Sequence, residues 1–232
     1  MSTNTTTNRV TARFQEKGRD LLNIYFTAGF PTPNATVDII RHLAEAGVDL
    51  IELGLPYSDP LADGPTIQAS GQEALAQGMT TRRVLDAVRE ARQHTEVPII
   101  LMGYFNQVLQ YGVADFCRDA RAAGVDGLIL PDLPVEIYDR QYRSIFEGEG
   151  LGLTFLITPQ TSDDRIRQID GLSQGFVYMV SSASVTGKQT GFSDAQRAYF
   201  ARIAALNLDT PRLIGFGIST HTDFKMACEH AH

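Results

Sequence analysis

Short apolar runs alternate with longer amphipathic stretches along the chain, and this pattern predicts strands joined by helices. The apolar runs are hydrophobic at successive positions, as is typical of parallel strands that helices cover on both faces. Strands are expected at residues 22–27, 48–53, 97–103, 127–131, 153–158, 176–181 and 212–217. Helices are expected at residues 35–46, 81–94, 113–123, 135–147, 163–172, 194–206 and 222–231.

Two joints between a predicted helix and the next predicted strand share the sequence Ala-Gly-Val-Asp, at residues 46–49 and 123–126. A glycine at the end of a helix closes it in the left-handed conformation, so the repetition indicates a βα unit used many times. Strict alternation at this length favours a (β/α)8 TIM barrel over an open doubly wound sheet. We expect one α/β barrel domain over residues 1–232, C-terminally truncated so that it lacks the last strand-helix unit.

Composition narrows the function classes. The 232 residues are 43% hydrophobic, enough for one sizeable core, and a net charge of −7 without a basic stripe argues against nucleic acid as a partner. No apolar stretch approaches the length of a membrane span, and the polar residues 1–8 lack a signal core. Without CxxC or HExxH motifs no metal site is expected. Cys117 and Cys228 are expected as unpaired thiols in the cytoplasm, with a disulfide between them left open.

Residues 50–65 carry the clearest chemical signal. Glu52 interrupts an apolar strand, and the following loop holds Asp59, Asp63 and three prolines. A lone carboxyl group in such a strand is costly to ionise unless it is paired or used. In one interpretation Glu52 reaches solvent or a lysine at the strand end. In the other it lies at the carboxyl-terminal mouth of a barrel with a pKa raised for proton transfer, which the second acid eleven positions later favours.

Polar or glycine-rich segments follow all the predicted strands, and the active sites of TIM barrels lie at that rim. Gly187 and Gly217 suit a close approach of backbone N–H groups to a phosphate, although ordinary turn glycines explain them equally well. Residues 184–191 fit a mobile lid that excludes water, or an idle surface loop. The converging loops together predict a phosphate-handling site.

Residues 52–68, ELGLPYSDPLADGPTIQ, resemble the signature of the tryptophan synthase alpha subunit family, and the resemblance runs from about Leu22 to the end through PDLP at 131–134, SVTG at 184–187 and GFGIS at 215–219. It implies a lyase of tryptophan biosynthesis that cleaves indole-3-glycerol phosphate to indole and glyceraldehyde 3-phosphate by a retro-aldol reaction, with no cofactor of its own. It further implies an α2β2 heterotetramer, in which a beta subunit with pyridoxal phosphate receives the indole.

The resemblance also implies roles for single residues. Glu52 matches the general acid and base, and Asp63 matches the carboxylate that accepts a hydrogen bond from the indole N–H. One carboxyl group with a pKa near neutrality can protonate C3 of the indole and deprotonate the C3′ hydroxyl, while an ionised second one stabilises charge on the indole nitrogen. The remaining substrate-binding matches are Tyr25, Met102, Ile129, Ile157, Tyr178, Thr186 and Phe216.

Phosphate and partner contacts are implied in the same way. The backbone at Gly187 and Gly217 matches phosphate-binding positions, and Asp59 and Pro60 match a loop that faces the beta subunit. The chain departs from the family at Ser184, where glycine is frequent, and it lacks the Gly-Ser-Ala segment that holds phosphate after strand eight. Phosphate affinity is therefore expected to be poor.

Two rival functions stay open. One is an epimerase or isomerase of sugar phosphates, but such barrels often use metal-binding histidines or a lysine at strand ends, and the predicted strand ends show neither. The other is a non-catalytic barrel that only activates the beta subunit. Glu52 and Asp63 argue against this second rival, whereas the absent Gly-Ser-Ala segment argues for it.

Overall fold

The structure, a computed structural model, describes residues 8–61, 63–180, 192–215, 218 and 220–232. Its strands are β1 (Asn23–Thr27), β2 (Leu50–Gly54), β3 (Ile99–Met102), β4 (Gly127–Ile129), β5 (Gly152–Thr154), β6 (Leu156–Ile157), β7 (Val177–Val180) and β8 (Arg212–Gly215). Its helices are α1 (Arg9–Lys17), α2 (Ala35–Glu45), α3 (Pro65–Ala76), α4 (Thr81–Ala91), α5 (Phe105–Tyr111), α6 (Val113–Ala123), α7 (Val135–Ile137), α8 (Arg143–Gly148), α9 (Asp163–Asp170), α10 (Asp194–Ala205) and α11 (His221–Cys228), with a π-turn, η1 (Tyr138–Tyr142), between α7 and α8.

The predicted alternation of strands and helices is confirmed. All the expected strands are present, and the expected strand at 153–158 is divided into β5 and β6 around Phe155. The helix expected at 135–147 is divided by η1 into α7 and α8. Helices α1, α3 and α5 were not expected: α1 directly follows the polar residues 1–8, α3 begins at Pro65, inside the signature loop, and α5 has only seven residues.

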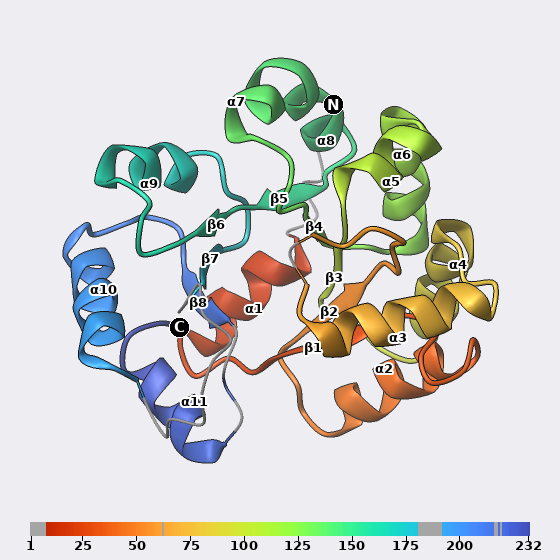
Figure 1. Ribbon diagram of the computed structural model, residues 1–232, viewed down its shortest axis with the longest axis horizontal. Helices are drawn as coiled ribbons and strands as arrows, with labels where there is room; N and C mark the ends of the chain where they lie inside the picture. The colour runs from red at the N-terminus through yellow and green to blue at the C-terminus, as the bar shows by residue number, and fades with distance from the viewer. Residues whose placement is uncertain (1–7, 62, 181–191, 216–217, 219) are drawn as a thin grey trace.

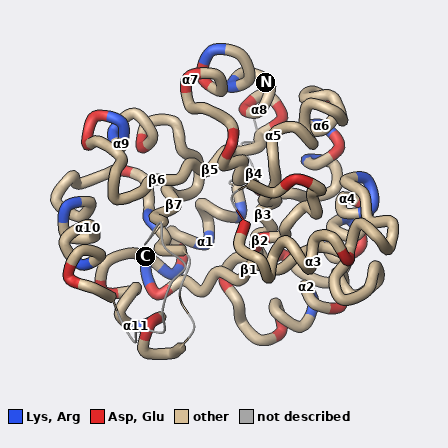
Figure 2. Tube along the Cα trace, viewed as in Figure 1, with Lys and Arg blue, Asp and Glu red and all other residues tan. Residues whose placement is uncertain are grey.

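The strands run parallel and surround a central axis, with α1 across the middle of the view and the other helices around the outside (Figure 1). One sheet has the order β1-β2-β3-β4-β5 and the other the order β6-β7-β8. The carbonyl of Phe155 accepts a hydrogen bond from the Tyr178 amide at 2.9 Å, which links the end of the first sheet to the second. Figure 2 shows acidic and basic positions interleaved on the outer helices. None of the helices in the described ranges is long and apolar enough to cross a membrane.

Side chains alternate between the two faces of each strand, and this alternation produces two apolar clusters. The outer cluster fills the space between strands and helices. The inner cluster fills the lower part of the barrel and consists of Val10, Phe14, Leu21, Leu50, Ile100, Ile129, Phe176, Tyr178 and Leu213. The carboxyl ends of the strands lie above this cluster, at the rim where the active sites of TIM barrels are found.

Helix α1 closes the amino-terminal end of the barrel. Val10 and Phe14 are buried in the inner cluster, where the Phe14 ring lies 5.9 Å from that of Phe176. The Asn8 side chain caps the helix by accepting the Val10 amide at 2.8 Å. Lys17 Nζ donates to the buried Asp49 carboxylate at 2.5 Å, which ties the last turn of α1 to the base of β2.

The repeated Ala-Gly-Val-Asp joints have a structural role. Gly47 and Gly124 have φ of 84° and 94°, so both adopt the expected left-handed conformation. The two aspartates that follow are nearly fully buried and bind the amide of a neighbouring strand: Asp49 accepts from Leu22 at 2.8 Å and Asp126 from Ile99 at 2.9 Å. Each joint thus fixes the start of a strand.

The backbone of His232 bridges the two outer strands of the sheets at their amino ends. Its N–H donates to the Arg212 carbonyl at 2.9 Å, and its carbonyl accepts the Leu21 amide at 3.0 Å. In the described part of the chain, β1 and β8 have a ladder partner on one side only. The last residue of the chain thus joins the start of β1 to the start of β8 at the base of the barrel.

Candidate active site

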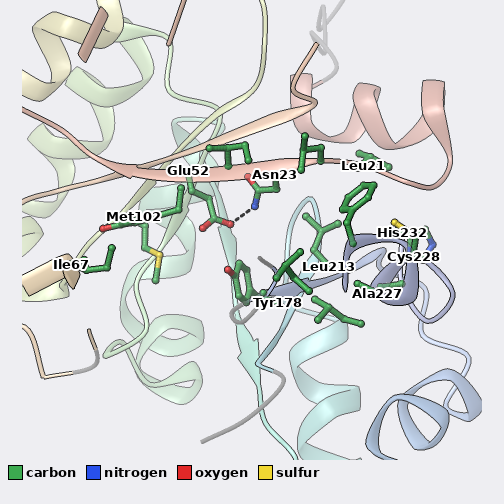
Figure 3. Close-up of a pocket in the computed structure, with 18 of the residues that line it drawn as sticks. Leu21, Asn23, Glu52, Ile67, Met102, Tyr178, Leu213, Ala227, Cys228 and His232 are labelled. Atoms are coloured by element: carbon green, nitrogen blue, oxygen red, sulfur yellow. Dashed lines mark hydrogen bonds between the residues drawn. The ribbon is translucent and has the colours of Figure 1, made fainter. Parts of the chain in front are cut away.

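Glu52 lies on the inner face of β2, between Leu50 and Gly54 on the same face. Only 1% of it is exposed, and it points into a cavity of about 500 Å³ whose lining extends from Leu21 and His232, at the base of the barrel, to Asp63 at the rim (Figure 3). Burial raises the pKa of this carboxyl group from 4.5 to about 7, although the hydrogen bond from the Asn23 amide opposes the shift. A group with this pKa can give and take a proton near neutral pH.

Asp63 enters the same cavity from the loop between β2 and α3. It is half-buried, and burial raises its pKa, while a hydrogen bond from the Tyr104 hydroxyl opposes this rise. The loop is held from below because Gln68 Nε2 donates to the Asp63 carbonyl at 2.8 Å. The cavity therefore contains two carboxyl groups in different surroundings, one deep in the wall and one in a more polar loop.

Two tyrosines complete the inner wall, and two glycines make room for them. A Cβ on Gly54 would lie 2.2 Å from the Tyr25 hydroxyl, and a Cβ on Gly215 would lie 2.0 Å from the Tyr178 ring. Burial raises the pKa of Tyr25 to about 12 and that of Tyr178 well above its usual value, so both phenols stay protonated at neutral pH. The glycines of β2 and β8 are thus required by neighbouring side chains.

The structure brings five of the predicted site residues together in one cavity. Tyr25, Met102 and Tyr178 line the cavity with the two acids. Ile129 belongs to the inner cluster beneath. The predicted residues Thr186, Gly187, Phe216 and Gly217 lie outside the described residues.

Ile157 does not lie with this group. It is packed in the outer cluster, and its carbonyl accepts the Tyr199 hydroxyl at 3.2 Å. Its neighbour Leu156 contacts the inner cluster instead. Because side chains alternate along a strand, a shift of one position exchanges the inner face for the outer one.

Asp59 and Pro60 lie at the rim, in the loop that leads from β2 to Asp63. Asp59 is exposed and accepts the hydroxyl hydrogen bond of its neighbour Ser58. Leu61 beside them is 96% exposed, more than any other large apolar side chain in the described ranges. This rim segment is set apart from the cavity and faces outward.

Sequence reasoning missed two residues of the site, Asn23 and Tyr104, which bond to Glu52 and Asp63 respectively. Asn23 precedes Tyr25 by two positions and shares its inward face, so the period of the strand was the signal available. Tyr104 follows Gly103 at the end of the third strand, and residues after the strands form the rim where the active sites of TIM barrels lie.

The geometry suits proton transfer at a carbon or hydroxyl centre of an apolar substrate. Glu52 is the deeper carboxyl group, with a pKa near neutrality, and Asp63 lies nearer the mouth, where a carboxylate can accept a hydrogen bond from an N–H group. Within the described ranges, no group of three or more His, Cys, Asp or Glu side chains is arranged to hold a metal ion. Both cysteines are free and buried, as expected.

Comparison with known proteins identifies the family. The family model "Tryptophan synthase alpha chain" matches residues 11–232. The tryptophan synthase alpha chain of Flavobacterium johnsoniae is 56% identical over 97% of this chain and 88% of its own length, and that of Christiangramia forsetii is 54% identical over 97% and 87%.

Solved structures agree with this result. An alpha-beta tryptophan synthase complex from Pyrococcus furiosus contains a chain with a TM-score of 0.86 and 35% identity, over 92% of this chain and 85% of that one. The subunit alpha from Legionella pneumophila gives a TM-score of 0.82 and 36% identity, over 92% and 79%. The fold is therefore that of these TIM barrels. By sequence and structure alike, the chain belongs to the tryptophan synthase alpha chain family, whose members cleave indole-3-glycerol phosphate.

Proposed function

We propose that Glu52 and Asp63 carry out the cleavage of indole-3-glycerol phosphate in this chain. The observation that carries the proposal is the placement of both acids in one cavity, with the pKa of Glu52 raised to about 7 by burial. A carboxyl group with this pKa exists in both protonation states at neutral pH. The reaction needs both states in turn.

In the proposed mechanism, protonated Glu52 donates its proton to C3 of the indole ring. The resulting carboxylate takes the proton of the C3′ hydroxyl while the C3–C3′ bond breaks. The electrons of that bond return to the ring and restore indole, and the oxygen electrons form the aldehyde of glyceraldehyde 3-phosphate. Glu52 ends the cycle protonated, so the step needs no cofactor in this chain.

Asp63 has a separate role in this mechanism. Protonation at C3 places positive charge on the indole nitrogen, and an ionised carboxylate that accepts the N–H stabilises that charge. Asp63 is only half-buried, so its ionised form is less costly than that of Glu52. The two carboxyl groups thereby divide the work between proton transfer and charge stabilisation.

The remaining predicted residues bind the substrate in this proposal. Tyr25, Met102 and Tyr178 form apolar walls for the indole ring, and Ile129 supports them from below. The family resemblance supports phosphate binding by the backbone at Gly187 and Gly217. It also supports a contact of Thr186 with Asp63 and a place for Phe216 in the wall of the indole pocket. For the fifth strand, the inward Leu156 is a better candidate for the indole pocket than Ile157.

We further propose that the rim around Asp59 and Pro60 binds a tryptophan synthase beta subunit, which supplies pyridoxal phosphate, in the cytoplasm. The exposed Leu61 lies in the same rim segment, and a partner docked there would cover it. One solved relative is described as an α2β2 complex with mutual activation.

We also propose that the opening between β1 and β8 is the place of an eighth strand-helix unit. β5 and β6 are two parts of the fifth predicted strand, so β8 is the seventh. Among the described residues, β1 and β8 each have a ladder partner on one side only.

The test of this function is the release of indole from indole-3-glycerol phosphate by the chain, alone and with a beta subunit. We expect release by the chain alone and a higher rate in the complex. Activation of the beta subunit without any indole release would instead support the non-catalytic barrel. Leu61→Ser should reduce the activation ratio and leave the fold unchanged, whereas Leu109→Ser, at another exposed leucine, should leave both unchanged.

A further inference from the structure

Asn23 is a polar side chain on the inner wall of the barrel. It is the first residue of β1, opposite Leu50 in the ladder, and it lies diagonally below Glu52 of β2. Leu21 and Leu213, which line the same cavity, are apolar (Figure 3). An amide in such surroundings is costly unless it forms hydrogen bonds, so the position of Asn23 calls for a specific reason.

The Asn23 side chain binds Glu52 directly. Its Nδ2 donates to Glu52 Oε1, and in the described part of the chain this is the one hydrogen bond that the Glu52 carboxyl group receives (Figure 3). The Asn23 Oδ1 atom is buried and has no hydrogen-bond partner among the described residues. The Nδ2 donor of the amide is therefore in use, whereas its Oδ1 acceptor is available.

An amide suits a carboxyl group that must change its protonation state. The carboxylate only accepts hydrogen bonds, and the Nδ2 group supplies a donor. The protonated carboxyl group has a hydrogen to donate, and a half-turn of the same amide presents Oδ1 as the acceptor. Leucine would offer neither contact, and aspartate would add a second negative charge.

We propose that Asn23 is a positioning residue for Glu52, holding its carboxyl group toward the substrate in both the charged and the neutral form. The inference rests on the proposed role of Glu52. It concerns a contact between β1 and β2 that the catalytic mechanism itself does not require.

Other titratable groups face the same cavity, and the test must separate them from Glu52. They are Asp63, Tyr25, Tyr178, Cys228 and His232. The infrared carbonyl band of a protonated carboxyl group reports only Glu52 and Asp63 from this set. The difference between spectra of the parent protein and its Glu52→Gln variant then isolates Glu52.

The experiment compares Asn23→Leu with the parent protein, in complex with a beta subunit. The amide bonds the carboxylate more strongly than the neutral carboxyl group, because a hydrogen bond to an ionised acceptor is stronger, so the loss of the amide raises the pKa of Glu52. We expect the Glu52 carbonyl titration and the pH profile of kcat to move together to higher pH by roughly one to two pH units, with little change in KM. Asn23→Asp should shift both further because of like-charge repulsion. Asn34→Leu, at an exposed asparagine without a capping bond, is the control.

Each outcome decides a separate point. An unchanged titration in folded Asn23→Leu overturns the inference, and Asn23→Ala provides the same test if leucine prevents folding. A shifted titration with an unchanged kcat profile shows a contact without a positioning role, and also overturns it. Full activity of Glu52→Gln would refute the proposed function instead, since the titration of Glu52 in the parent protein does not depend on catalysis.

Discussion

Tyr25 and Glu52 lie opposite each other in the parallel ladder between β1 and β2, so a phenol and a carboxyl group stand side by side on the inner wall of the barrel. Burial makes the ionised form of both groups costly and is the main cause of the raised pKa of each. The phenol stays neutral near pH 7, whereas the carboxyl group is brought into the range of proton transfer. The inner wall thus selects Glu52 as its titrating group near neutral pH.

Replacement of Glu52 by glutamine tests its proposed role. Glu52→Gln keeps the shape of the side chain but removes its proton exchange, so indole release should fall by a factor of at least about 10². The measurement is steady-state indole release with a beta subunit present. Glu90→Gln, at an exposed residue of α4, should behave as the parent protein. Near-normal turnover by a folded Glu52→Gln protein would contradict the proposed role of Glu52 in proton transfer.

Protein stability should depend on pH through Glu52. Its folded pKa of about 7 lies above the ordinary value of 4.5, so the stability it contributes is fully present below about pH 4.5 and is lost as the pH rises through 7. Glu52→Gln removes this loss. Between about pH 5 and pH 8 the variant should gain up to about 3 kcal/mol over the parent protein in urea unfolding. Parallel stability curves for the two proteins would contradict the raised pKa.

The role of Asp63 can be separated from that of Glu52 by the choice of substrate. Asp63→Asn should strongly slow cleavage of indole-3-glycerol phosphate, because the charge on the indole nitrogen loses its carboxylate. On an analogue with oxygen in place of that nitrogen, the same substitution should matter far less. The comparison uses the ratio of kcat/KM values for the two substrates. Equal losses on both would indicate that Asp63 only shapes its loop.

Gly215 should be intolerant of a side chain. Its Cβ would overlap the Tyr178 ring at 2.0 Å, so Gly215→Ala must displace a buried tyrosine in the cavity wall. We expect a loss of stability of about 1–3 kcal/mol and a raised KM for indole-3-glycerol phosphate. Gly148→Ala, in a helix with open space around the new Cβ, should be neutral or slightly stabilising. Equal effects of the two substitutions in thermal unfolding would argue against the clash.

Asp126 should be important for stability and not for chemistry. It accepts hydrogen bonds from Arg9 at 2.9 Å, from Arg92 at 2.5 Å and from the Ile99 amide, and it is 1% exposed. Asp126→Ala leaves two guanidinium groups and an amide without their acceptor, at a cost of roughly 3 kcal/mol. Asp86→Ala, which breaks an exposed pair with Arg89, should cost less than about 1 kcal/mol. A small loss for Asp126→Ala in urea unfolding would show that the arginines find other partners.

The barrel architecture was predictable because its signals are local. Apolar runs, amphipathic stretches and the glycines at the Ala-Gly-Val-Asp joints each depend on a few neighbouring residues, and the structure confirms the resulting order of strands and helices. Glu52 was also predictable, since one acid in an apolar strand is visible without any partner. The extra helices escaped prediction because α1 lies before the first strand, α3 begins inside the signature loop, and α5 has only seven residues.

The finer geometry was not predictable from the sequence. Ile157 and Leu156 are adjacent apolar residues, and only the pleat of the fifth strand decides which of them faces inward. The glycines at 54 and 215 show the same limit, because the rings that need their space come from neighbouring strands.

By itself, then, the sequence determined the kind of fold, the family and the acid in the barrel wall, since periodicity and motifs are properties of consecutive residues. Only the tertiary structure decided what that acid meets. Asn23 and Glu52 are 29 positions apart, and their contact exists because the register of β1 and β2 places the two side chains on one face. Burial by the surrounding strands then sets the pKa, a property that no local pattern contains.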